Sequence, residues 1–190
     1  MIEELIHKSR SYRRFDESER VSPETLRKLV DLARLSPSAA NLQPLKYILS
    51  TDPLKNDEIF SRLLWAGYLH DWVGPAEGER PTAYIMILGD TRLGAAGCDH
   101  GIAAQTIMLA AVGMGYGGCI LGSIHREDLR KALNIDSRYE ILLIIALGKP
   151  NETVELETVD DAGSIKYWRD DDDVHHVPKR QLDEIILTSY

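Results

Sequence analysis

The chain has 190 residues, a formal net charge of -8 at pH 7 and 44% hydrophobic residues. This length and composition are typical of a single globular domain, expected here to span residues 1–190 around a continuous core. The acidic balance argues against nucleic acid as a partner, because phosphate backbones select basic surfaces. No stretch approaches the roughly 18 apolar residues of a membrane span. The acidic first residues do not resemble a secretory signal, so we expect no membrane partner and a cytoplasmic location.

Hydrophobic spacing and capping residues predict three helices and one strand in the first third of the chain. Apolar residues at helical spacing predict a short amphipathic helix over residues 2–6. Ser22-Pro23 supplies a capping hydroxyl and a proline at the first helical position, so a second helix is expected from there to Ser36-Pro37. Residues 45–49 have the composition of a strand. Asp52-Pro53 opens a third helix, whose expected buried residues are Ile59, Leu63 and Leu64.

The second half of the chain continues to alternate helices with strands. The nearly unbroken apolar run at residues 83–88 is typical of a strand buried on both faces. A helix is expected over residues 125–133 and a central strand over residues 140–147. Residues 167–177 suggest a hairpin or an extended excursion, which a short apolar helix follows at residues 182–187. This alternation predicts a layered α/β or α+β domain.

Residues 99–114 are apolar on almost every side, and a helix without a polar face is buried in a core or against another subunit. The glycines that follow, at residues 113–118, fit the pattern G-x-G-x-x-G. The dinucleotide-binding fingerprint requires a strand before these glycines and a helix after them. Here a helix precedes and a strand, Cys119 to Leu121, follows. The glycines are therefore interpreted as a helix end and not as a Rossmann motif.

No metal site or side-chain nucleophile is predicted. Cys98 and Cys119 have no metal-type spacing and are interpreted as buried, reduced thiols without a chemical role. Residues 170–173 are four aspartates close to His175 and His176, but adjacent histidines on a strand point to opposite faces and rarely share one ion. A solvated acidic turn is the favoured interpretation. Any chemistry is therefore expected to belong to a cofactor.

Three polar clusters remain as candidates for binding such a cofactor. Residues 8–15 contain three arginines and two serines in an acidic chain, and an arginine fork matches phosphate geometry. Residues 38–41 combine small side chains, which allow close approach of a ligand, with the amide of Asn41. Lys179-Arg180 is the third cluster. A separate aromatic segment, residues 65–72, is explained either by core packing or as a wall over a planar ligand.

Several of these segments resemble the FMN-dependent nitroreductases. Ser9 to Phe15 is similar to that family's R-R-S-x-R-x-F motif, although Ser9 replaces the first arginine. Ala33 to Pro44 is similar to its A-x-x-A-P-S-x-x-N-x-Q-P segment and is the most specific match. The alanine-rich helix with its glycines, the Ile120-Leu121-Gly122 step, residues 146–150 and residues 178–180 follow in the family's order. The resemblance covers nearly the whole chain.

The resemblance implies an α+β fold, with a central, mostly antiparallel sheet flanked by helices, in an intertwined homodimer with FMN at the subunit interface. By motif position, the phosphate and the polar edge of the flavin would be held by Arg10, Ser11, Arg13, Lys179 and Arg180. The flavin would be lined, from the partner subunit, by Ser38, Ala39, Ala40 and Asn41. A backbone N–H would reach flavin N5 near Leu121 and Gly122. Arg14 is expected to be a surface residue.

The activity that the resemblance implies is ping-pong hydride transfer from NAD(P)H through flavin N5 to a small acceptor, such as a nitroaromatic compound, a quinone or a flavin-like molecule. No catalytic side chain is expected, because the protein orients the reactants and excludes water. Two alternatives stay open: a flavin-binding carrier or redox regulator without NAD(P)H turnover, and a specialised relative that removes halogen or fragments flavin. In the latter, residues 65–72 or 167–177 would form a lid over the substrate.

Overall fold

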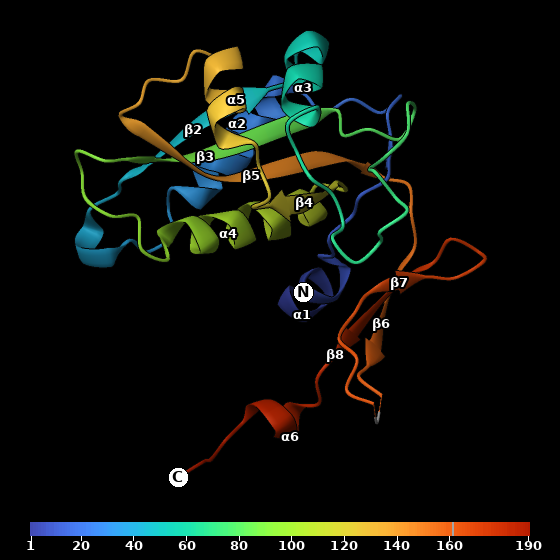
Figure 1. Ribbon diagram of the computed structural model, residues 1–190. Helices are drawn as coiled ribbons and strands as arrows, with labels where there is room; N and C mark the ends of the chain where they lie inside the picture. Colours follow the sequence, from blue (N-terminus) through green and yellow to red (C-terminus); the bar gives the residue numbers. More distant parts are fainter. Residues whose placement is uncertain (161) are drawn as a thin grey trace. The chain divides into compact units, whose positions relative to one another are not determined.

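The computed structural model describes residues 1–160 and 162–190, and the chain divides into two compact units. The first unit comprises residues 1–65 and 74–151, and the second comprises residues 66–73 and 152–190. The first holds α1 (Ile2–Lys8), β1 (Phe15–Asp16), α2 (Pro23–Ala33), the 3-10 helix η1 (Ala39–Asn41), β2 (Leu45–Ser50), α3 (Pro53–Phe60), β3 (Ala83–Asp90), α4 (Asp99–Gly113), β4 (Gly117–Leu121), α5 (Arg126–Ala132) and β5 (Tyr139–Pro150) (Figure 1). The second holds β6 (Val154–Thr158), β7 (Trp168–Arg169), β8 (His175–Lys179) and α6 (Leu182–Ile185).

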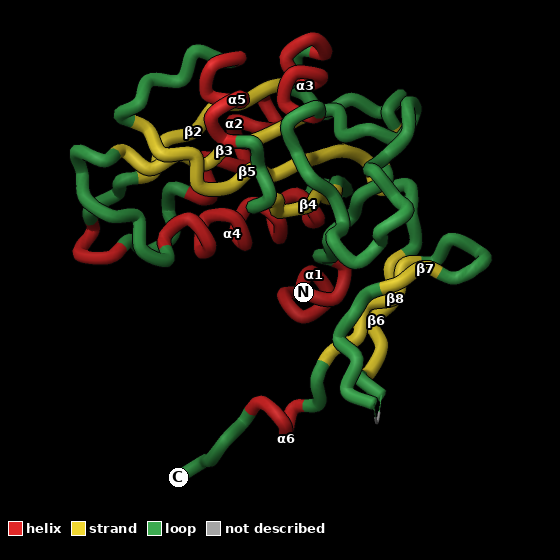
Figure 2. The backbone as a smooth tube through the Cα atoms, in the orientation of Figure 1, coloured by secondary structure: helices red, strands yellow, loops and turns green. Residues whose placement is uncertain are grey.

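The five strands of the first unit form one antiparallel sheet in the order β1-β5-β3-β2, with β4 also paired to β5 (Figure 2). Strand β5 organises this sheet because it pairs with β3 and also with both β4 and β1. Gly117 of β4 lies opposite Gly148, and Phe15 of β1 lies opposite Pro150. The predicted α+β class with a mostly antiparallel central sheet is therefore confirmed.

Helices cover both faces of this sheet, with α4 on one side and α3 and α5 on the other (Figure 1). Because side chains alternate along a strand, β3 supplies residues to both layers. Its odd-numbered residues, Ile85 and Ile87, join a core cluster with Leu26 of α2 and Ile107 of α4. Its even-numbered residue Met86 lines a cavity on the other face, together with Ile59 of α3. All eight residues of β3 are buried, which confirms the strand predicted to be covered on both faces.

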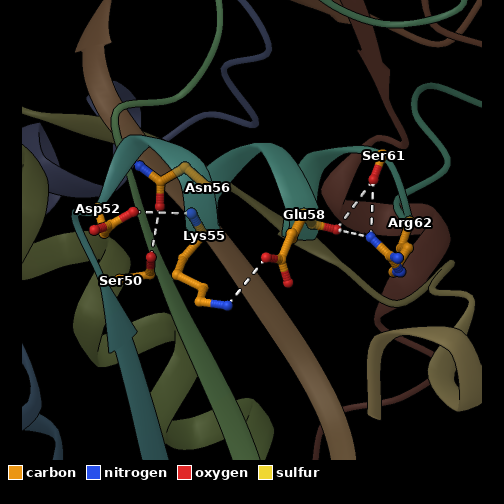
Figure 3. A network of polar contacts seen from close by, with 7 residues as sticks. All are labelled: Ser50, Asp52, Lys55, Asn56, Glu58, Ser61 and Arg62. Carbon is orange, nitrogen blue, oxygen red and sulfur yellow. Dashed lines mark hydrogen bonds and ion pairs between the residues drawn. The ribbon is translucent and has the colours of Figure 1, made fainter. Parts of the chain in front are cut away.

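Two helices begin where their capping residues predicted. The Ser22 hydroxyl accepts a hydrogen bond from the Thr25 amide at 3.1 Å, and the Asp52 carboxylate accepts one from Lys55 at 3.0 Å (Figure 3). Figure 3 also shows how α3 is tied to the sheet, since Ser50 of β2 donates to the Asn56 side chain at 2.7 Å. These caps satisfy amides that the first helical turn leaves without partners.

Three sequence-based expectations about these elements are wrong. Helix α2 ends at Ala33 and not at Ser36-Pro37, because the proline disfavours helical backbone before it and the last residues form tight turns. Helix α3 ends at Phe60, so Leu64 lies outside the helix and is exposed. Cys98 is exposed just before α4, whereas Cys119 on β4 is buried as expected. The two cysteines do not form a disulfide bond with each other.

The glycine segment that follows α4 allows close backbone packing. A Cβ atom on Gly117 would come within 2.5 Å of the Tyr12 and Pro150 side chains, and one on Gly118 would meet the Ala146 carbonyl at the same distance. Such contacts are too short, so β4 needs glycine where it approaches β5 and the arginine-rich segment. A helix precedes these glycines and a strand follows, which agrees with the rejection of a Rossmann motif.

The second unit is built on a three-stranded sheet in which β8 pairs in parallel with β6 and antiparallel with β7. The predicted hairpin is therefore present as β7 and β8. Residues 66–73 pack on this hairpin: the Tyr68 and Tyr167 rings are 5.0 Å apart, and the Arg169 guanidinium lies 4.5 Å from the centre of the Trp72 ring. The two segments singled out as possible lids, residues 65–72 and 167–177, thus belong to the second unit, except for Trp65, which belongs to the first.

The second unit also contains a buried ion pair. The guanidinium of Arg169 lies 2.9 Å from the Glu152 carboxylate, and both side chains are almost fully buried.

Among the described residues of the whole chain, no helix is both long and apolar enough to cross a membrane.

Candidate functional site

Arg10, Ser11 and Arg13 lie where α1 ends and the chain approaches β4. Ser11 forms a parallel bridge with Gly118, and the Tyr12 amide donates to the Gly118 carbonyl at 2.9 Å. The Arg10 Nη2 group donates to the carbonyl of Ile6 in the last turn of α1. Because a carbonyl is neutral, this hydrogen bond leaves the charge of the guanidinium available to an anion.

Arg13 and Arg14 diverge in their contacts. Arg13 donates to the Ser11 carbonyl at 3.2 Å, which folds its side chain back onto the arginine segment. Arg14 instead pairs with Glu79 at 3.4 Å and its side chain is only 19% exposed. Arg14 was expected to be a surface residue, but most of its side chain is buried and it forms an ion pair with Glu79.

Residues 38–43 form a strained loop that contacts the first residue of α4. The backbone φ angles of Ala40, Asn41 and Gln43 are 48°, 54° and 50°. This left-handed region costs a non-glycine residue roughly 1–2 kcal/mol. Such strain is held in place by its surroundings and clusters at ligand-binding sites. The left-handed backbone of this segment is therefore typical of a binding loop. The small side chains in its sequence did not predict this backbone conformation.

Asp99, the first residue of α4, holds this loop and was not among the residues predicted from the sequence. Its buried carboxylate accepts a hydrogen bond from the Ser38 hydroxyl at 2.6 Å and one from the Ala39 amide at 3.2 Å. Ser38 Oγ in turn accepts from the Gln43 amide at 2.9 Å. An acid in the first turn of a helix is common, so the sequence carried no specific signal for this role.

A cavity of about 220 Å³ lies beside the loop. Its lining includes Ser38, Gln43, Asp99, Lys46 and the Tyr47 side chain. Burial, and secondarily the negative charge of Asp99, raises the pKa of Tyr47. Tyr47 is therefore a neutral hydroxyl at physiological pH, able to donate or accept a hydrogen bond in this cavity.

The arginine segment and the strained loop lie at opposite ends of α4 within one chain. The loop contacts Asp99 at the start of the helix. Helix α1, which leads into the arginine segment, reaches the other end, where a Cβ atom on Gly113 would lie 3.9 Å from Leu5 (Figure 1). A helix of 15 residues is about 22 Å long at 1.5 Å per residue. The structure therefore does not bring these two predicted parts of the site together in one subunit.

Leu121 and Gly122 lie at the end of β4, and a residue missed from the sequence fixes their backbone. The guanidinium of Arg126 donates to the Gly122 carbonyl at 3.1 Å and to the Ile141 carbonyl of β5 at 2.9 Å. On the other side, the Leu64 amide donates to the Ser123 carbonyl at 3.0 Å. The Leu121-Gly122 step is thus held from two directions, while Leu121 itself is buried.

Lys179 and Arg180 belong to the second unit. Lys179 ends β8, and its carbonyl accepts a hydrogen bond from the Val159 amide at 2.9 Å. Arg180 follows directly and lies 3.5 Å from the carboxylate of Glu184 in α6. Both side chains are exposed, so they are free of the core, and their contribution to a shared phosphate site stays a prediction.

Comparison with known proteins identifies the chain. The model of the Nitroreductase family matches residues 6–77 and 82–149, which include the arginine segment, the strained loop, α4 and β4. The chain belongs to this family. A Bacillus subtilis protein, YodC, provisionally named an NAD(P)H nitroreductase, is 27% identical over 174 residues, covering 73% of this chain and 84% of the relative. Membership makes the chain an oxidoreductase of the flavin-dependent nitroreductase type.

Solved structures share the fold of this nitroreductase-family chain. A nitroreductase family protein from Streptococcus pneumoniae superposes with a TM-score of 0.74 at 20% identity, covering 100% of both chains. A provisionally assigned nitroreductase from Desulfovibrio desulfuricans, solved in complex with FMN, gives a TM-score of 0.72 at 24% identity, covering 100% of this chain and 96% of that one. At these identities the likeness concerns the fold.

The arginine segment offers what an FMN phosphate or flavin edge requires. Arg10 Nε is buried and has no hydrogen-bond partner within the described part of the chain. A buried donor without an acceptor is rare and calls for a partner. Among the described residues, the hydrogen bond of the Arg10 guanidinium goes to the neutral Ile6 carbonyl, so its positive charge is not compensated there. Arg10 therefore fits an anionic, phosphorylated cofactor of the FMN type.

Proposed function

We propose that the chain is an FMN-dependent NAD(P)H oxidoreductase that acts as a homodimer, with each site shared between two subunits. The observation that carries this proposal is the placement of the two candidate binding segments at opposite ends of α4. Two subunits related by a twofold axis, with their α4 helices antiparallel, would bring the Arg10 end of one subunit to the Ser38 end of its partner. That arrangement would create two equivalent sites per dimer.

The surface of α4 supports such pairing. In one chain its outer face exposes Ile102 and leaves Leu109 and Val112 only half-buried. An apolar stripe on a helix is stable when a partner covers it. The exposed apolar residues of the C-terminal segment, such as Leu182 and Ile185 of α6, supply a second surface for contact with another copy.

Within this proposal the protein binds and orients, and it needs no acid or base of its own. FMN, when bound, supplies hydride acceptance at N5 and hydride delivery to the second substrate. Arg10 and Arg13 would neutralise negative charge on the cofactor, and the Ser38–Asn41 loop would lie along the flavin. The backbone at Gly122, held by Arg126, would present its N–H to N5. Rigid donors aimed at the site of charge development stabilise that charge without reorganisation.

The names of the curated relatives suggest NADH or NADPH as reductant and a nitro compound as acceptor. Absorbance spectroscopy of the purified protein, reconstituted with FMN, tests the proposal. We expect flavin bands that bleach when NADH or NADPH is added without oxygen and return when a nitroaromatic compound or a quinone is added. Bands that only dithionite bleaches would indicate a carrier or regulator without turnover. A protein that cannot bind FMN at all would overturn the proposal.

A further inference from the structure

Asp99 has a geometry that its own helix does not require. The residue that caps α4 is Cys98, which makes no side-chain capping hydrogen bond. The Asp99 carboxylate accepts hydrogen bonds from Ser38 and Ala39, which lie 61 and 60 residues earlier in the chain. Asp99 is also only 5% exposed. Removing a carboxylate from water costs free energy, which hydrogen bonds to the carboxylate must offset.

The loop that Asp99 contacts has no glycine to make its conformation easy. Ala40, Asn41 and Gln43 all have positive φ angles, and only glycine adopts this region freely. Without the carboxylate, the Ser38 hydroxyl and the Ala39 amide would lose their acceptor, and the backbone could relax to φ below zero. The loop is also linked internally, because Ser38 Oγ accepts from the Gln43 amide at its far end. One carboxylate therefore acts on both ends of the loop.

We infer that Asp99 is a positioning residue, whose carboxylate holds residues 38–43 in the one backbone conformation that can lie along a flavin bound against the partner subunit. This inference rests on the proposed function. It differs from a merely structural role, because the residue would govern the order of one loop and the affinity for FMN rather than the stability of the core.

A matched control exists on the same helix. Two turns further along α4, the Thr106 hydroxyl lies 2.9 Å from the hydroxyl of Ser36, and this contact also ties the segment after α2 to α4. It does not reach the strained residues. Thr106→Val keeps the side-chain volume and removes this tie, together with the hydrogen bond from the Thr106 hydroxyl to the Ile102 carbonyl within α4. Asp99→Ala removes the two hydrogen bonds to the loop.

The test combines hydrogen exchange of the apo protein with FMN titration. In Asp99→Ala we expect faster exchange at the Ala39 and Gln43 amides and FMN affinity lowered about tenfold or more, the loss expected for hydrogen bonds to a charged group. Asp99→Asn keeps one acceptor and should lose less affinity, and Thr106→Val should match the wild type in both measurements. If Asp99→Ala leaves either the exchange of these two amides or the FMN affinity unchanged, the inference is wrong.

Failure of this inference can be told apart from failure of the proposed function. If the wild-type protein binds no FMN, the proposed function is overturned and so is the purpose assigned to the loop. The exchange of the apo protein would still show whether Asp99 orders residues 38–43. If the wild type binds FMN and Asp99→Asn folds with unchanged exchange and affinity while Asp99→Ala unfolds globally, Asp99 is a stability residue only.

Discussion

Arg10 connects the end of α1 to the candidate cofactor site through a single guanidinium group. One nitrogen already donates to the Ile6 carbonyl, while the buried Nε has no acceptor among the described residues. We predict that Arg10→Ala weakens FMN binding by about 1.5–3 kcal/mol, the usual value of a hydrogen bond to a charged group. Titration of the apo protein with FMN, followed by flavin fluorescence, measures this loss.

The neighbouring Arg14 provides the control for this prediction. It has the same charge but pairs with Glu79, so Arg14→Ala changes the net charge equally without removing the proposed cofactor contact. We expect its FMN affinity to stay near the wild-type value. Equal losses in the two variants would mean that FMN responds to overall charge, and unaltered affinity in Arg10→Ala would remove Arg10 from the site.

At the level of elements, His176 on β8 makes side-chain contacts with both neighbouring strands of the sheet in the second unit. One ring nitrogen lies 2.7 Å from Glu157 of β6, and the other lies 3.0 Å from Asp170 beside β7. The ring also stacks on Trp168 at 4.2 Å. Hydrogen bonds donated by the ring to the carboxylate of Asp170 and, to a smaller extent, to that of Glu157 raise the pKa of His176 above its usual value. When it is protonated, the ring links three strands, because it can donate to both carboxylates while it stacks on Trp168.

The pH dependence of this contact follows from the raised pKa of His176. The stabilisation is fully present below pH of about 6.5, the pKa of an unfolded histidine. It is lost as the pH rises through the higher folded-state pKa, because the neutral ring can no longer donate to both carboxylates. We predict that the Tm difference between the wild type and His176→Gln is largest near pH 6 and shrinks toward pH 9.

Thermal denaturation across this pH range is the measurement, with His7→Gln as the control. His7 is exposed in the last turn of α1 and lies in the first unit. Its variant should follow the wild type at every pH. A Tm difference for His176→Gln that does not change with pH would contradict a role for the protonated ring.

For the whole molecule, the decisive prediction concerns which subunit supplies each part of the site. Co-expressed chains, one with Arg10→Glu and the other with Ser38→Ala and Asn41→Ala, form mixed dimers. If each site combines Arg10 of one subunit with Ser38 and Asn41 of its partner, a mixed dimer contains one site with no substitutions. Random pairing would then restore about a quarter of all sites.

Bound FMN per dimer, counted after gel filtration, measures this restoration. Each variant expressed alone should bind little FMN, and the co-expressed pair should bind more than either. If both parts of a site came from the same subunit, every site in a mixed dimer would carry a substitution and nothing would be restored. A monomer in gel filtration would contradict the shared site directly.

The two units of the chain are expected to unfold together in thermal denaturation. The second unit has fewer than fifty residues, and nearly all the buried apolar side chains of the described chain lie in the first unit. A unit this small rarely folds alone without disulfides or a metal. The sequence-based expectation of a single domain over residues 1–190 therefore predicts one cooperative unfolding transition for both units.

Much of this fold could be predicted from local patterns. Ser22-Pro23 and Asp52-Pro53 start their helices because a capping oxygen and a following proline act within one turn. The apolar run of β3 predicted a strand buried on both faces, because neither face has polar side chains suited to water. Leu64 and Cys98 were predicted wrongly, because exposure just beyond a helix end depends on where the chain turns next.

The candidate site, too, could be predicted from the sequence only in part. From the sequence, the alternation of elements left α/β or α+β open, and the resemblance to the nitroreductases chose the α+β class that the structure shows. The sequence also proposed the arginine segment and the loop at residues 38–41 as binding segments, because short motifs carry hydrogen-bond chemistry wherever the fold places them. Only the tertiary structure revealed that Asp99 holds the loop, that Arg126 holds the Gly122 carbonyl and that the two binding segments lie at opposite ends of α4. These contacts join residues far apart in the chain, and their distances are set by how helices pack on a sheet, which no local pattern encodes.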